Sequence, residues 1–128
     1  MSTYHVLAAM LDKLKEHPSE IRKSAVARLI ARLWTLHQMS YSIAGMLERG
    51  VVPNTEAALV KDLGTRFEQD IPETARSIFP EELREISGKN DLFNDALRYA
   101  TLYAPAYSIR GGTKEILRGI IAKSLGLR

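Results

Sequence analysis

Apolar residues recur every three or four positions along most of the chain, separated by charged and polar residues. This spacing places the apolar side chains on one face of a helix, which turns once in about 3.6 residues. No segment alternates apolar and polar residues over about four or more positions, as a half-buried strand would, and no long internal repeat is present. The pattern therefore predicts an all-α protein.

The first predicted helix ends at His17-Pro18, because the residue before a proline avoids the helical region of backbone conformation. Thr3 is its predicted N-cap. Its apolar positions are Val6, Leu7, Met10, Leu11 and Leu14. A much longer second helix is predicted from Pro18 or Ser19 to Gly50, about eight turns and roughly 45 Å in length.

The long helix carries two apolar stripes. The first stripe consists of Ile21, Ala25, Leu29, Leu33, Leu36, Ser40, Ile43 and Leu47, and the second stripe, displaced around the helix, consists of Val26, Ile30, Trp34, His37 and Tyr41. A helix that is apolar on two sides needs a cover on each side, and one small bundle readily supplies only one. The second stripe therefore indicates a surface that a missing domain or another subunit covers, with a broad core helix as the simpler alternative.

A third helix is predicted from Asn54 or Thr55, either of which is a candidate N-cap, to Phe79-Pro80. Pro72 lies inside this helix, and we expect a kink there because proline lacks the backbone N–H that a helix needs. Residues 81–90 predict a connecting loop with at most a helical turn. A fourth helix is predicted over residues 91–103.

The last part of the chain predicts a break near Pro105, then a flexible turn at residues 110–113, Arg-Gly-Gly-Thr, whose Thr113 can cap a short last helix. Four long elements joined by short turns favour an antiparallel up-and-down arrangement. The predicted fold is therefore an antiparallel up-and-down four-helix bundle with a short C-terminal fifth helix. We expect residues 1–128 to form a single domain.

Composition narrows the classes of function. The absence of cysteine excludes disulfide scaffolds, thiol catalysis and thiolate metal sites. His5, His17 and His37 lie far apart, and none follows a glutamate at the spacing of a di-iron bundle, so no metal site is expected. Serines and threonines near these histidines show no nucleophile-elbow pattern, which leaves no basis for a hydrolase. His37, beside Trp34 and Tyr41, is expected to be an interface or core histidine.

Neither a membrane nor a nucleic acid is an expected partner. No apolar stretch approaches the roughly 20 residues of a membrane span, and the N-terminus lacks the features of a secretory signal, so a cytoplasmic location is expected. The net charge is +3, and basic residues gather at the C-terminus: Arg110, Lys114, Arg118, Lys123 and Arg128. That segment attracts anions or is a solvated helix face. No helix carries the long basic stripe, interleaved with aromatic residues, that nucleic-acid binding requires.

The glycines at 111 and 112 allow two interpretations. The segment Gly111-Gly112-Thr113-Lys114 lacks the four-residue spacer and the preceding strand of a Walker phosphate loop. Glycines nevertheless let a backbone approach a ligand closely, and a helix N-terminus attracts anions. The residues alone leave open an anion site and a simple reversal of the chain.

Residues 107–127, YSIRGGTKEILRGIIAKSLGL, closely resemble the C-terminal signature of acyl-CoA dehydrogenases. In that family a helix ends in a Gly-Gly-Thr-x-Glu-Ile or Glu-Gly-Thr-x-x-Ile turn, followed by an arginine and an Ile-Ile-Ala helix. Similar features lie upstream: a long helix ending in LERG at 47–50, a linker with Pro53, and EAALVKDL at 56–63. The resemblance covers about residues 18–128.

The resemblance implies a flavoprotein that removes the α and β hydrogens of an acyl-CoA thioester. FAD takes the hydride in that family, and an electron-transfer flavoprotein usually takes the electrons. The resemblance also implies a four-helix bundle that covers one side of the flavin and packs in a homotetramer or dimer, which would explain the second stripe. Gly112, Thr113 and Glu115 are the implied cofactor-binding residues.

The sequence also departs from the family. Gly111 occupies the position where medium-chain members carry their glutamate base, so no catalytic residue is assigned. The family's Arg-x-x-Phe-Gly cofactor segment and its N-terminal and middle domains are not found in this sequence. We therefore expect a C-terminal domain that contributes flavin contacts and an interface, to a homo-oligomer or to a partner dehydrogenase subunit, without being catalytic alone. The alternative is a stand-alone helical dimerisation module without cofactor.

Overall fold

The computed structural model describes residues 3–81 and 92–127. The helices are α1 (Tyr4–Glu16), α2 (Glu20–Glu48), α3 (Asn54–Ile78), α4 (Leu92–Tyr103), the short 3-10 helix η1 (Ala104–Ser108) and α5 (Lys114–Ser124). These two ranges contain no strand, so the prediction of an all-α fold is confirmed.

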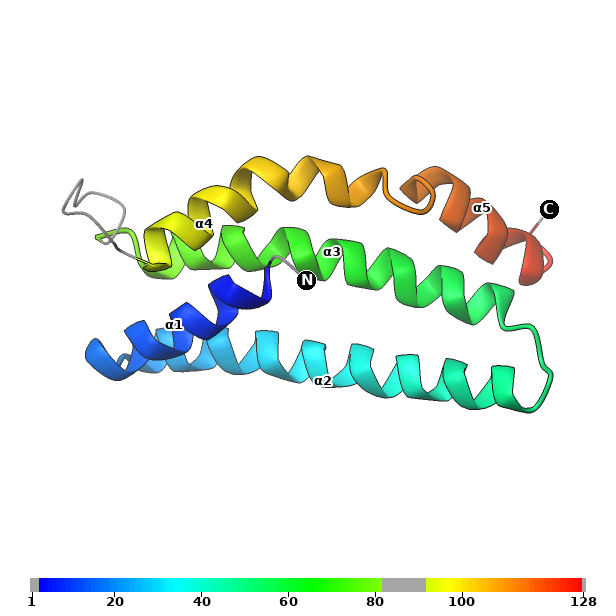
Figure 1. Cartoon of the computed structure of the whole chain (residues 1–128), viewed down its shortest axis with the longest axis horizontal. Helices are drawn as coiled ribbons and strands as arrows, with labels where there is room; N and C mark the ends of the chain where they lie inside the picture. Colours follow the sequence, from blue (N-terminus) through cyan, green and yellow to red (C-terminus); the bar gives the residue numbers. More distant parts are fainter. Residues whose placement is uncertain (1–2, 82–91, 128) are drawn as a thin grey trace.

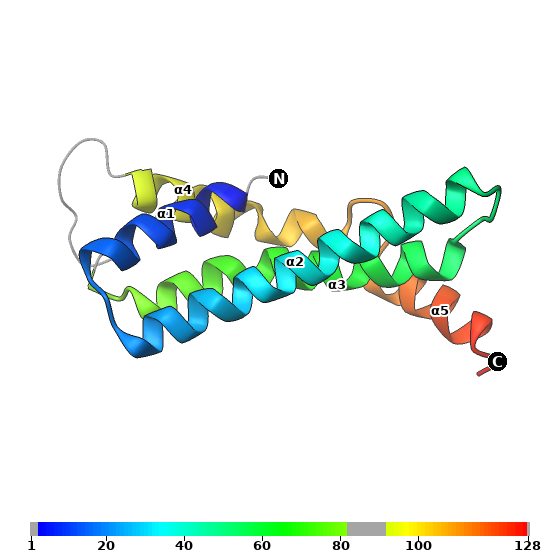
Figure 2. The same cartoon turned by 90° about the horizontal axis from the view of Figure 1, so that it is seen from below.

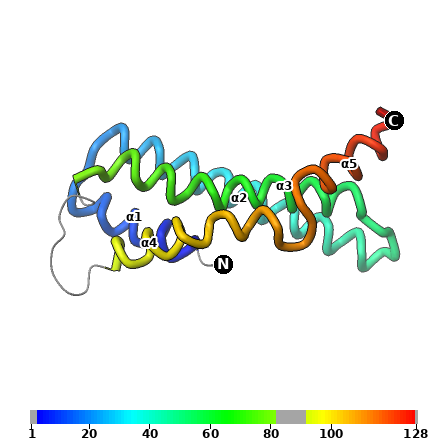
Figure 3. The backbone as a smooth tube through the Cα atoms, turned by 90° about the horizontal axis from the view of Figure 1, so that it is seen from above, coloured from blue at the N-terminus to red at the C-terminus, as the bar shows by residue number. Residues whose placement is uncertain are grey.

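Two long helices, α2 and α3, form an antiparallel pair that runs the length of the molecule (Figure 1). The opposite side of α3 is covered by three consecutive shorter helices, which are α4, η1 and α5 (Figure 3). The predicted up-and-down bundle with a short C-terminal helix is therefore confirmed.

The first helix is much shorter than its neighbour. α1 has 13 residues and α2 has 29, so α1 covers only the first part of α2, where it also packs against α4 (Figure 2). At the opposite end of the molecule α2, α3 and α5 lie together without a further described helix over α2. The bundle is thus fully four-helical at one end only.

The apolar core lies at the end where α1 and α4 are present. The helices α1, α2, α3 and α4 all contribute side chains to this core. Phe79 and Phe93 meet there edge to face, with ring centroids 5.4 Å apart. The buried members are Val6, Leu7, Met10, Val26, Leu29, Phe67, Ile71, Ala75, Phe79, Phe93, Leu97 and Ala100. Burial of such side chains is the main favourable term in folding, so this end anchors the bundle.

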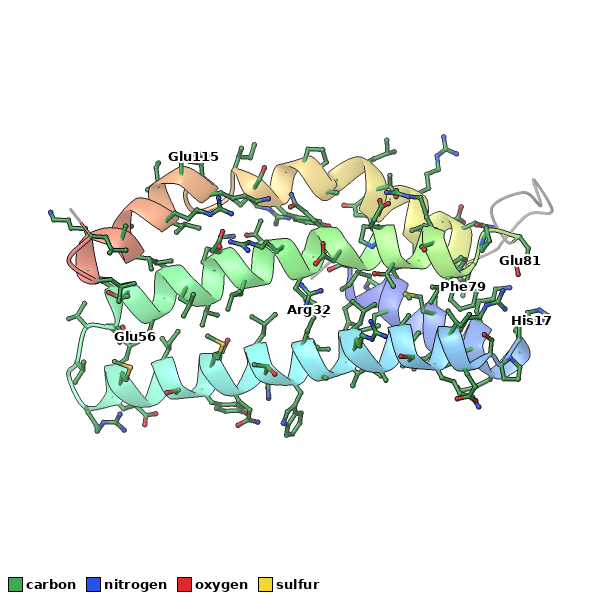
Figure 4. The ribbon with its side chains drawn as sticks, turned by 180° about the vertical axis from the view of Figure 1, so that it is seen from behind. His17, Arg32, Glu56, Phe79, Glu81 and Glu115 are labelled. Carbon is green, nitrogen blue, oxygen red and sulfur yellow. The ribbon has the colours of Figure 1, made fainter. Side chains whose placement is uncertain are left out.

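In the middle of the molecule, Arg32 joins α2 to α3. Its guanidinium lies 5.4 Å from the centroid of the Phe67 ring, and its Nη2 is 2.8 Å from Oδ2 of Asp70. Figure 4 shows this side chain reaching from α2 toward α3. The aliphatic part of the arginine covers the aromatic ring while its charge stays paired at the surface.

The helix caps agree with the sequence in part. Oγ of Ser19 accepts a hydrogen bond from the Arg22 backbone N–H at 3.5 Å, as an N-cap serine should. Thr3 occupies the N-cap position of α1, but its side chain makes no capping bond, because its backbone is already helical (φ −80°, ψ −16°). The predicted cap at Asn54 or Thr55 is wrong, since the cap position is Pro53, whose carbonyl accepts from the Ala57 N–H at 2.9 Å.

Prolines mark three other points along the chain. α3 continues as a helix through Pro72, which is fully buried, so this proline does not end it. The predicted end at Phe79-Pro80 is confirmed, and the predicted break near Pro105 takes the form of η1. Most of the loop predicted for residues 81–90 lies outside the described residues.

Within residues 3–81 and 92–127, we find no helix that combines the length and the apolar character needed to cross a membrane.

Candidate functional site

The Gly-Gly turn, residues 110–113, connects η1 to α5. Gly111 has φ 73° and Gly112 has φ 107°, and both values lie in the left-handed region that side chains disfavour. A Cβ at Gly111 would also lie 3.4 Å from Cε of Lys61 on α3. This backbone conformation therefore requires glycine at both positions. Gly111 and Gly112 contribute no side chains that would cover the backbone of the turn.

Thr113 begins α5 without capping it. Its backbone is extended (φ −72°, ψ 163°), as expected of an N-cap, but its side chain accepts no bond from the first turn of α5. The predicted cap by Thr113 is therefore wrong in its side-chain contact. The hydroxyl instead donates a hydrogen bond to the carboxylate of Glu115 and helps to stabilise it.

Glu115 lies exposed on α5, two residues after Thr113. The pKa of its carboxyl is lowered, first because the carboxylate accepts a hydrogen bond from its own backbone N–H and then because of the Thr113 hydroxyl. The charges of Arg118 and Lys114 lower it further. Glu115 is therefore ionised at neutral pH, and Figure 4 shows it on the side of α5 that faces away from α3.

Basic residues surround the Gly-Gly turn. The Arg110 guanidinium lies 5.0 Å from the centroid of the buried Tyr107 ring, and Lys114 and Arg118 follow on α5. Lys61 approaches from α3 at Gly111. Arg128, the last of the predicted basic residues, lies outside the described range. These basic side chains make the surface around the turn electropositive, and Glu115 adds a carboxylate on α5.

Side chains of α3 form hydrogen bonds to residues before and after the turn. The Gln69 Nε2 donates to the carbonyl of Ala104 in η1 at 3.2 Å, and its Oε1 accepts from Nζ of Lys114 in α5 at 3.0 Å. Oγ1 of Thr65, one turn earlier on α3, donates to the carbonyl of Tyr107 at 3.4 Å. Sequence reasoning missed Gln69 and Thr65, although polar residues at helical spacing on an otherwise packed helix are a usable signal.

A third polar residue, Asp62, lies on the same side of α3 as Thr65 and Gln69. It is buried, and Oδ2 pairs with the Arg66 guanidinium, whereas Oδ1 has no hydrogen-bond partner. An unpaired buried carboxylate oxygen normally costs stability. The interface between α3 and the η1–α5 line is therefore polar along part of its length.

The hollows of the described residues include two whose linings do not contain residues 110–113. One, of about 630 Å³, lies between α1 and α4 and includes His5, Asp12 and Tyr99. The other, of about 410 Å³, lies between α2 and α3 beyond the end of α1, and its walls include Leu36, Ile43, Val60, Phe67 and His37. The second hollow is mainly apolar and lies where α2 lacks a further covering helix.

The second stripe of α2 divides into a covered and an uncovered part. Val26 is buried in the core, whereas Ile30, Trp34 and Tyr41 have exposed fractions of 43%, 65% and 64%. His37 is also exposed and lies edge-on to Tyr41, with ring centroids 4.6 Å apart. The broad-core alternative is therefore wrong beyond Val26, because α1 is too short to reach the later members of the stripe.

The histidines stay apart in the fold as in the sequence. His5 is on α1, His17 lies near the charge of Glu81, and His37 lies on α2. Across the described ranges, no group of three or more histidine, aspartate or glutamate side chains is placed to hold a metal ion.

Comparison with protein families gives one match. The family model described as the C-terminal domain of acyl-CoA dehydrogenase matches residues 12–126. No curated protein and no solved structure matches the chain significantly. The matched range includes the Gly-Gly turn, α5 and both long helices.

Proposed function

Because this chain belongs to the family of acyl-CoA dehydrogenase C-terminal domains, we propose that it is the C-terminal domain of an FAD-dependent acyl-CoA dehydrogenase. In this role it contributes contacts to the flavin and a surface for assembly, and it does not complete the reaction alone. The observation that carries the proposal is the family match over residues 12–126, which includes the Gly-Gly turn.

The proposed reaction removes the α and β hydrogens of an acyl-CoA thioester, and FAD supplies the hydride acceptor when it is bound. Abstraction of the α proton needs a base. Gly111 has no side chain that could take a proton, so we assign no catalytic residue to this chain and place the base elsewhere in the enzyme. Electrons would pass to an electron-transfer flavoprotein.

The residues of the Gly-Gly turn fit a flavin nucleotide. The cofactor carries an anionic pyrophosphate and several hydroxyl groups, and Arg110 and Lys114 supply positive charge beside the turn. Thr113 offers a hydroxyl, and the ionised Glu115 can accept a hydrogen bond from a sugar hydroxyl. At Gly112 no side chain blocks the close approach of a ligand to the backbone.

The placement of the site supports a contribution to one side of the cofactor only. Gly111 and Glu115 are exposed, and Glu115 faces away from α3 on the outside of the bundle (Figure 4). A dinucleotide held tightly needs burial of most of its surface. The remaining contacts would therefore come from another domain or another subunit.

The uncovered part of the second stripe is the proposed assembly surface. Trp34 and Tyr41 are large amphipathic side chains, which are enriched at the centres of protein interfaces. His37 lies between them, with its ring centroid 6.1 Å from that of Trp34 and 4.6 Å from that of Tyr41, and it helps to line the apolar α2/α3 hollow. We propose that a second copy of the chain, or a partner dehydrogenase subunit, covers this surface.

The cofactor proposal is tested by titrating the 128-residue chain with FAD while following backbone amides by two-dimensional NMR. We expect progressive shifts at residues 110–118 and none at the core end of the bundle. Replacing Thr113 and Glu115 together by Ala should raise the dissociation constant at least about ten-fold, because hydrogen bonds to charged groups are lost. The matched control replaces Thr35 and Glu48, both exposed on α2, by Ala.

Two outcomes would count against the cofactor proposal. One is the absence of any shift at the Gly-Gly turn up to millimolar FAD. The other is an unchanged dissociation constant for the Thr113→Ala, Glu115→Ala protein, which would remove these residues from the site.

A second candidate function is a stand-alone helical dimerisation module without cofactor. The observation that favours it is the exposed second stripe, together with the absence of a base at Gly111. It predicts that the protein is a dimer in sedimentation and that Trp34→Glu makes it monomeric, because a charge in a buried interface is costly. Leu92→Glu, at an exposed position of α4, is the control. A wild-type protein that sediments as a monomer would contradict the dimerisation module. FAD-induced NMR shifts at the Gly-Gly turn would contradict a module without cofactor.

A further inference from the structure

Gln69 contacts both sides of the segment that contains the Gly-Gly turn. Its Nε2 reaches the carbonyl of Ala104 at 3.2 Å, and its Oε1 receives Nζ of Lys114 at 3.0 Å. These partners lie 35 and 45 residues away along the chain. One side chain of α3 therefore fixes the entry and the exit of residues 104–114.

The segment is also held by Tyr107, whose side chain is buried and whose ring centroid lies 5.0 Å from the Arg110 guanidinium. Gly111 and Gly112 both have positive φ, and glycine loses more conformational freedom on ordering than any other residue. Thr113 makes no side-chain capping bond to α5. Thr65 adds one further bond from α3, to the carbonyl of Tyr107 at 3.4 Å. Besides these local contacts, the hydrogen bonds from Gln69 and Thr65 fix the segment to a helix that is distant in sequence.

We propose that Gln69, assisted by Thr65, is a positioning residue for the Gly-Gly turn, holding its backbone and Thr113 in the conformation that meets the cofactor. The link to the cofactor rests on the proposed function, whereas the holding of the turn does not. Gln69 acts through the backbone of η1 and through Lys114.

The chemistry of the amide explains why this position needs glutamine. Its group has a donor and an acceptor at the same end, which matches a carbonyl on one side and an ammonium on the other. A glutamate at this position would keep the acceptor for Lys114 but leave the Ala104 carbonyl without its donor. A leucine of similar size would lose both bonds.

The test is hydrogen–deuterium exchange on the 128-residue chain, measured by mass spectrometry of peptides. For Gln69→Leu, we expect exchange across residues 104–118 to accelerate about ten-fold, since two hydrogen bonds of ordinary strength are lost. Exchange in the core end of α2 should stay unchanged. Gln38→Leu, an exposed glutamine on α2, is the matched control and should leave all segments unchanged.

Two further variants separate the two contacts. Lys114→Met removes only the α5 side, so residues 111–118 should exchange faster while η1 keeps its protection. Gln69→Glu retains the bond to Lys114 and should show the opposite pattern, with faster exchange in η1. A general structural role for Gln69 would not produce these reciprocal patterns.

Unchanged exchange at 104–118 in Gln69→Leu would overturn the proposal, as would uniform acceleration throughout the chain. Should Gln69→Leu fail to fold, the two single-contact variants decide the question. The FAD titration tests the link to the cofactor. Gln69→Leu should raise the dissociation constant of FAD several-fold although Thr113 and Glu115 are intact. Absence of FAD binding in the wild type would reject the proposed function while the exchange patterns still decide whether Gln69 holds the turn.

Discussion

The guanidinium of Arg22, at the start of α2, lies over the ring of Phe79, at the end of α3, with 4.9 Å between its central carbon and the ring centroid. Its Nε donates to the Ile78 carbonyl at 2.8 Å and its Nη1 to the His17 carbonyl at 3.2 Å. Its Nη2 pairs with Glu81. This one side chain therefore joins the end of α3 to the link between α1 and α2. Figure 4 labels His17, Phe79 and Glu81, which lie at this end of the molecule.

Replacement of Arg22 by Ala should destabilise the protein by about 2 to 3 kcal/mol, because it removes charge-assisted hydrogen bonds and exposes the Phe79 ring. Urea unfolding followed by circular dichroism measures the change. Lys23→Ala is the control, since Lys23 is well exposed and its ammonium pairs with the exposed Glu20, and its effect should stay below about 0.5 kcal/mol. Equal effects of the two substitutions would contradict the assigned role of Arg22.

The Arg22–Glu81 ion pair should make the stability of the fold depend on pH. The pKa of Glu81 is lowered, first by a hydrogen bond from its own backbone N–H and then by the charge and hydrogen bond of Arg22, with a smaller contribution from His17. A carboxyl with a lowered pKa in the folded state stabilises the fold above its ordinary pKa. That stabilisation is lost as the pH falls from the ordinary value through the lowered one.

We therefore expect the stability difference between wild type and Glu81→Gln to be present at neutral pH and to shrink in this acidic window. Because the Glu81 side chain is exposed, solvent screens the interaction and the difference should be small. Unfolding free energies measured from about pH 7 to about pH 2 test the sign. A difference that grows on acidification would show that ionised Glu81 does not stabilise the fold.

In the core, Phe93→Ala should cost about 3 to 5 kcal/mol, because Phe93 is 2% exposed and its loss leaves a cavity beside Phe79. The adjacent Leu92 is 81% exposed, so Leu92→Ala should change the stability by less than about 0.5 kcal/mol. Denaturant unfolding of the two variants compares neighbouring positions of α4 directly. A small effect at Phe93 would show that the α1–α4 end is not the core.

Two glycines of the C-terminal region should respond oppositely to alanine. Gly112→Ala should destabilise by about 1 kcal/mol or more, since φ is 107° and alanine disfavours that conformation. Gly119 lies within α5 with open space at its Cβ position, so Gly119→Ala should stabilise by up to about 1 kcal/mol. Thermal melting of both variants gives the two signs. Stabilisation by Gly112→Ala would refute the left-handed turn.

Much of the helical architecture follows from the sequence because helices depend on contacts within a few residues. The three-to-four-residue spacing, Ser19 as a cap, and Gly50 and Phe79-Pro80 as ends predict α2 and the end of α3 as the structure has them. The Gly-Gly turn could be found in the same way, since positive φ at two successive positions requires glycine. Local rules failed at Thr3 and Asn54, where the backbone is already helical at the predicted cap.

Other features depend on which elements meet, and only the tertiary structure decides them. Val26 is buried and Trp34 is exposed, although both belong to the second stripe, because α1 covers one and not the other. Gln69 and Lys114 meet across 45 residues of sequence. Hydrophobic periodicity predicts which face of a helix seeks cover, but the partner, its length and the polar contacts it makes are set by the packing of distant segments.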